Sequence, residues 1–113
     1  MKGVLLETKN NTYRLRFSIN AQAEIEELLG VSMFSLMSDG NSIKKMRTMI
    51  CIGINHGEKQ NLTYDQAGEI MDEILEVKGL QYLSRKLSEA IKQSYGDIGK
   101  DSESEEDDES KKK

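Results

Sequence analysis

The chain is poor in the residues that stabilise small secreted domains or build catalytic sites. Of its 113 residues one is cysteine, Cys51, one is histidine, His56, and none is proline or tryptophan. A single cysteine excludes an intramolecular disulfide and any cysteine cluster for zinc. Because free cysteine is among the most buried residue types, we expect Cys51 to fill a small apolar site.

Long hydrophobic runs are also missing. The apolar start at Val4 to Leu6 is interrupted by Glu7 and Lys9, and the longest later apolar stretch, from Met49 to Ile54, has only six residues. A membrane-spanning helix needs about 20 apolar residues, and a signal peptide needs an uninterrupted apolar core. We therefore expect a soluble protein that stays inside the cell and has no membrane partner.

Charge of one sign is confined to the end of the chain. Residues 1–96 carry twelve Lys and Arg against twelve Asp and Glu, so the net charge of −4 comes from residues 97–113. The body has no basic stripe with interleaved aromatics, which disfavours a nucleic-acid partner. The run from Asp101 to Glu109 has no apolar residue to offset the entropy of ordering. We predict a disordered acidic tail over residues 97–113.

Two β-type segments open the chain, at residues 4–8 and 12–17, with a short polar turn between them. The second alternates Tyr13, Leu15 and Phe17 with polar residues, a period-two pattern typical of a half-buried strand. Since an isolated hairpin is marginal in water, its apolar face should lie against helices.

Helical spacing dominates the rest of the body. Ser18 or Asn20, Ser32, Ser42 and the capping box of Thr63 and Gln66 mark the starts of helices, while glycines 30, 79 and 96 mark ends. The predicted fold class is mainly α (α+β): a hairpin on a bundle of about four helices, in one domain over residues 1–96. Predicted helical segments are 21–29, 31–37, 43–57, 64–78 and 80–95.

Apolar stripes predict which side of each helix is buried. The first helix should bury Ala21, Ile25, Leu28 and Leu29. The central helix has a broader stripe that approaches full burial. Its members are Ile43, Met46, Met49, Ile50, Cys51, Ile52, Gly53 and Ile54.

The residues offer little for catalysis, so we predict a binding protein that is not an enzyme and uses no cofactor. His56 lies at a predicted helix end, where an imidazole commonly contacts free carbonyls. The acidic residues of the 64–78 helix suit a solvated face better than a metal site, since no histidine or Asp-rich loop accompanies them. They are Asp65, Glu69, Asp72, Glu73 and Glu76.

Methionines concentrate between residues 33 and 49. Any one of them is more simply a filler of an irregular core, but methionine also suits surfaces that repack around varied helices. As a cluster they are the best candidate for a partner-binding groove. The candidate residues are Met33, Phe34, Leu36, Met37, Met46, Met49 and Ile50.

With these elements placed, the body resembles the small tail assembly chaperones of long-tailed bacteriophages and prophages. The likeness lies in YRLRFSINA (13–21), EIEELLG (24–30), IKKMRTMICIGINH (43–56) and NLTYDQAG (61–68), and it extends to about Tyr95. One departure is the segment from Cys51 to Gly53, where an aromatic residue and alanine are expected in relatives.

The resemblance implies a protein that binds the tape-measure protein, keeps it soluble and promotes polymerisation of the tail-tube protein around it. It also implies action in the host cytoplasm, absence from the mature virion and a longer product made by programmed frameshifting. Lys111 to Lys113 are compatible with an A-rich slippery site. Homo-oligomerisation stays open.

Two other functions compete with this one. A minor virion or connector component of a prophage would remain in purified particles. A small acidic regulatory protein that mimics nucleic acid would need the segment from Asp101 to Lys113, whereas a chaperone with its groove in the body would not.

Overall fold

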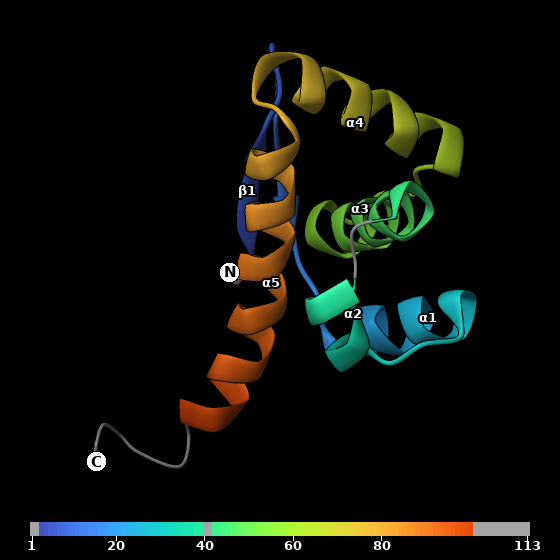
Figure 1. Ribbon diagram of the computed structural model, residues 1–113, viewed down its shortest axis with the longest axis vertical. Coiled ribbons are helices and arrows are strands. Elements are labelled where there is room, and N and C mark those ends of the chain that lie inside the picture. Colours follow the sequence, from blue (N-terminus) through green and yellow to red (C-terminus); the bar gives the residue numbers. More distant parts are fainter. Residues whose placement is uncertain (1–2, 40–41, 101–113) are drawn as a thin grey trace.

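The computed structural model describes residues 3–39 and 42–100, with side chains at 3–36 and 42–94. Its elements follow one another as a hairpin and then helices (Figure 1). In chain order they are β1 (Val4–Glu7), β2 (Thr12–Leu15), α1 (Ile19–Leu29), α2 (Met33–Asp39), α3 (Ile43–Glu58), α4 (Tyr64–Val77) and α5 (Leu80–Lys100).

This arrangement confirms the predicted mainly helical fold with an N-terminal hairpin. The predicted tail began at residue 97, but residues 97–100 belong to α5, so this boundary is wrong; residues 101–113 of the predicted tail lie outside the described residues. The predicted stop at Gly96 is wrong, because α5 continues through it to Lys100. A helical glycine costs only about 1 kcal/mol relative to alanine, so it weakens a helix without ending it.

The hairpin is antiparallel, and Leu6 pairs with Tyr13 and Val4 with Leu15. Side chains of paired residues share a face, so Leu6 and Leu15 both point inward, and both are fully buried. Phe17 continues this face and is buried as well. The predicted apolar face of the hairpin is therefore confirmed.

Two glycines on one side of α3 let β2 lie directly against the helix. A Cβ at Gly53 would overlap the side chains of Leu15 and Phe17, and a Cβ at Gly57 would overlap the carbonyl oxygen of Arg14. A larger residue at Gly57 would push the strand backbone away, and one at Gly53 would displace the side chains of Leu15 and Phe17. The spacing of four residues places both glycines on the same face of the helix.

This close approach also pairs the outer edge of β2. The N–H of Arg16 donates to the carbonyl of Gly53 at 3.0 Å, and the N–H of Arg14 donates to the Glu58 carboxylate at 2.6 Å. On the other strand, the N–H of Glu7 donates to the Tyr82 hydroxyl of α5 at 3.0 Å. Helix groups thus take over hydrogen bonds that a two-stranded sheet would leave to water.

Caps define the helix starts where the sequence predicts them. Ser18, Ser42 and Thr63 each accept a hydrogen bond from the backbone three residues on, and Thr63 forms a reciprocal capping box with Gln66. Gly30, at φ 70°, ends α1 in the left-handed conformation that glycine adopts without steric cost. These motifs depend only on neighbours in the chain.

Helix α3 occupies the middle of the fold, between α4 on one side and α1 on another (Figure 1). Every residue from Met46 to Ile54 is buried except Arg47. Two predicted core positions are wrong: Leu28 is 49% exposed and Ile43 is 61% exposed. Both lie near a helix end, where the apolar stripe extends beyond the elements that could cover it.

Candidate functional site

The methionine cluster is largely interior. Five of the seven candidate residues are buried, Phe34 is 69% exposed, and the side chain of Met37 lies outside the described part. The open groove predicted for this cluster is therefore wrong for the buried five. They are Met33, Leu36, Met46, Met49 and Ile50.

The physical reason is that α3 is surrounded by the hairpin and several helices. The methionines fill the irregular space between elements of different kinds, for which their unbranched side chains are well suited. Among the six cluster residues whose side chains the structure describes, Phe34 alone is exposed. Its partner-binding role stays a prediction.

His56 does not cap the end of α3 as predicted. Its Nε2 lies 3.2 Å from the Glu24 carboxylate, and its Nδ1 lies 3.3 Å from the Ser18 hydroxyl. The order of serine, histidine and carboxylate is that of a hydrolytic triad. The Ser18 hydroxyl, however, also accepts the N–H of Ala21 as the cap of α1. We assign these three side chains a structural role, in which they hold α1 against α3.

Cys51 is buried, as predicted, and its thiol donates to the carbonyl of Leu62 at 3.3 Å. Burial raises the pKa of this thiol, and the nearby Glu24 carboxylate adds to the effect, while a hydrogen bond from Asn55 opposes it. Because the thiolate is the reactive form, a raised pKa makes Cys51 a poor nucleophile at neutral pH.

The acidic residues of α4 do not assemble with other ligands into a metal centre. Within residues 3–36 and 42–94, no three His, Cys, Asp or Glu side chains come together in a way that could hold a metal ion. In the same part of the chain, no helix is long and apolar enough to cross a membrane. Three of these carboxylates instead line an open groove.

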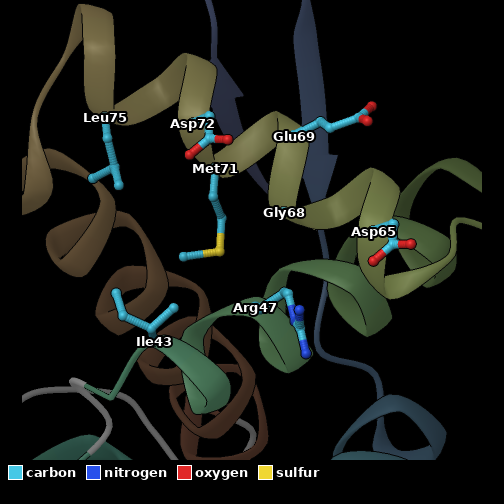
Figure 2. A pocket seen from close by; sticks show the side chains of 8 residues that line it. All are labelled: Ile43, Arg47, Asp65, Gly68, Glu69, Met71, Asp72 and Leu75. Carbon is cyan, nitrogen blue, oxygen red and sulfur yellow. The ribbon is translucent and has the colours of Figure 1, made fainter.

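The groove lies between α3 and α4 and has a volume of about 470 Å³. Figure 2 shows an apolar end and a charged end. Ile43, Met71 and Leu75 lie toward the apolar end, whereas Arg47 and Asp65 lie toward the charged end. All eight lining residues come from the two helices: Ile43, Arg47, Asp65, Gly68, Glu69, Met71, Asp72 and Leu75.

The two helices contribute unlike charges to this groove. The wall from α4 carries three carboxylates and the wall from α3 carries one guanidinium, so the formal charge of the lining is negative. No ion pair joins Arg47 to a carboxylate among the described residues. Because these charges are not paired with each other, they are available to a ligand.

Arg47 is held in place by its neighbours on α4. Its guanidinium carbon lies 5.5 Å from the centroid of the Tyr64 ring, a favourable arrangement of cation and aromatic face. The stem of Arg47 passes beside Gly68, where a Cβ would lie at an ordinary contact distance of 3.6 Å from Arg47 Cδ. The Nε–H of Arg47 is buried, and no described atom accepts its hydrogen bond.

The sequence contains only part of the signal for this groove. Ile43 fits the apolar stripe of α3 and was expected in the core, and the carboxylates were expected on a solvated face. An apolar side chain at the start of one helix and an acidic face on the next become a groove only through the angle between α3 and α4. Comparison with protein-family models, curated proteins and solved structures finds no match for the chain.

Proposed function

We propose that this protein is a tail assembly chaperone of a long-tailed bacteriophage or prophage. In this role it binds the tape-measure protein, keeps it soluble in the cytoplasm of the bacterial host and promotes polymerisation of the tail-tube protein around it. The resemblance of residues 13–95 to such chaperones motivates the proposal. The single observation that supports it most is the open groove between α3 and α4.

An amphipathic helix is the natural ligand of such a groove. Helix-in-groove recognition places apolar side chains from successive turns into a hydrophobic trough and charged ones along its rim. Ile43 and the partly buried Leu75 offer the trough, whose lining also includes the buried Met71, and the α4 carboxylates complement lysine or arginine on the bound segment. A long helical client with basic residues beside an apolar stripe fits both features.

Ile43 is the residue through which the groove can be tested without disturbing the fold. Its side chain is 61% exposed, so Ile43→Asp leaves the free protein folded but places a carboxylate where the client packs. Leu28→Asp is the matched control, because Leu28 is a similar side chain, 49% exposed on α1 and outside the groove.

The test is co-expression with the tape-measure protein from the same genome. The wild-type chain should form a complex and raise the soluble fraction of the client, Ile43→Asp should lose both effects, and Leu28→Asp should keep them. Purified particles should lack the chain by mass spectrometry. The proposal is wrong if the wild type neither forms a complex nor improves client solubility, or if the chain is a stoichiometric part of the virion.

A further inference from the structure

Resting on the proposed function, we infer that Arg47 selects the bound segment by pairing with one of its carboxylates. The ligand of the groove is then a helix of mixed charge: basic toward α4, and with a single Asp or Glu placed to meet the guanidinium of α3. Arg47 becomes the specificity-determining residue of the groove, and it fixes the orientation in which the helix lies.

Arg47 has a buried N–H donor that no described atom accepts. Buried N–H groups in folded proteins almost always have a hydrogen-bond acceptor. A buried N–H without one, on a side chain that lines a binding groove, therefore indicates that the ligand supplies the acceptor. Arg47 Nε is such a group, and the side chain that carries it lines the groove. The planar guanidinium that carries this Nε–H presents paired N–H donors, which a single carboxylate can accept.

The guanidinium of Arg47 is already held in position before a ligand binds. The Tyr64 ring faces it at 5.5 Å, and its stem passes Gly68 of α4 at ordinary contact distance. A guanidinium that is held on an aromatic face loses less side-chain entropy when it pairs. Although the groove also contains Asp65, Glu69 and Asp72, none forms an ion pair with Arg47.

The charges of the groove also restrict the charge of the ligand. The three carboxylates of α4 repel a phosphate dianion more strongly than a carboxylate, which carries one charge. The planar fork of arginine matches a carboxylate in two parallel hydrogen bonds. The chemistry of the site therefore favours an acidic side chain on an otherwise basic helix over a phosphorylated ligand.

The experiment uses the full chain and overlapping helical peptides that span the tape-measure protein, with affinities measured by titration calorimetry. A bound peptide should contain an Asp or Glu whose amide replacement weakens binding about ten- to a hundred-fold. Arg47→Gln should cause a similar loss, the two changes together should cost little more than one, and Arg47→Lys should fall between.

Arg85→Gln is the matched control, because Arg85 also stacks on a tyrosine ring, at 5.6 Å from Tyr82, but lies on α5. It should leave peptide affinity unchanged, and inorganic phosphate should not compete with the peptide. If peptides bind and Arg47→Gln has no effect, or phosphate displaces them through Arg47, the inference is wrong while the proposed function stands. If no peptide binds the wild type, both are overturned.

Discussion

Helix α3 packs in different ways against two of its neighbours, β2 and α4. Toward β2 it presents Gly53 and Gly57. A methyl group at Gly57 would overlap the backbone carbonyl of Arg14, and one at Gly53 would overlap the side chains of Leu15 and Phe17. Toward α4, whose apolar side is buried in the core, an open groove remains between the two helices. One face of the helix thus contributes to stability by close packing, whereas the other leaves surface available for binding.

The glycines in these two interfaces face different kinds of atoms. Gly57 faces the carbonyl of Arg14, a backbone atom that cannot move without displacing the strand, whereas Gly68 faces only the flexible stem of Arg47 at ordinary contact distance. The same substitution should therefore damage one interface and leave the other intact. The predictions below use this contrast, in order of decreasing effect on the free energy of unfolding.

The largest effect is expected for Gly57→Ala. Alanine favours a helix by about 0.5–1 kcal/mol relative to glycine, but the overlap with the Arg14 carbonyl should outweigh this and cost at least about 3 kcal/mol. Urea denaturation followed by far-UV circular dichroism measures the change. Unfolding at the wild-type midpoint would show that β2 does not depend on this close approach.

Met49→Ala should follow, with a loss of about 2–3 kcal/mol from a cavity in the core. Phe34→Ala, at an exposed position of the same predicted cluster, should cost less than about 1 kcal/mol. Equal losses measured by the same urea titration would contradict the assignment of the methionines to the interior.

Thr63→Ala removes the cap of α4, the wall of the groove that carries the carboxylates. Loss of the reciprocal capping box with Gln66 should cost about 1 kcal/mol. Thr63→Ser, which retains a hydroxyl, is the control and should remain close to the wild type. Thermal unfolding of the three proteins side by side is sufficient, and an unchanged midpoint for Thr63→Ala would argue against the cap.

The smallest effect, and the only gain, is expected for Gly68→Ala. Because its Cβ would meet only the stem of Arg47 at 3.6 Å, the helix propensity of alanine should raise the free energy of unfolding by about 0.5–1 kcal/mol. Destabilisation as large as that of Gly57→Ala would remove the distinction between the two faces of α3.

The same contrast explains what could be predicted from the sequence. Caps at Ser18, Ser42 and Thr63 and the stop at Gly30 act within a few residues, so local patterns identify them. The roles of Gly53 and Gly57 could not be predicted, because a glycine in an apolar stripe does not show that a strand lies on it. The exposure of Ile43 likewise depends on where α4 crosses α3.

The candidate site was harder to predict from the sequence than the fold, for the same reason. The methionine cluster is a set of chain neighbours, and most of its side chains turn toward the interior. Arg47 stands out only in three dimensions, through its unsatisfied Nε–H and its place in a groove that is also lined by the carboxylates of α4. Functional surfaces built from two distant segments have no local signal in either segment.

The central claim is that the client binds in the groove between α3 and α4 and leaves the face of α3 that packs on β2 unchanged. Amide hydrogen exchange of the complex with the tape-measure protein, followed by mass spectrometry, tests both halves at once. We predict slower exchange over residues 43–47 and 65–75 and no change over 12–15 and 53–57. Protection of the hairpin and its contact on α3, with the groove unaffected, would contradict this account.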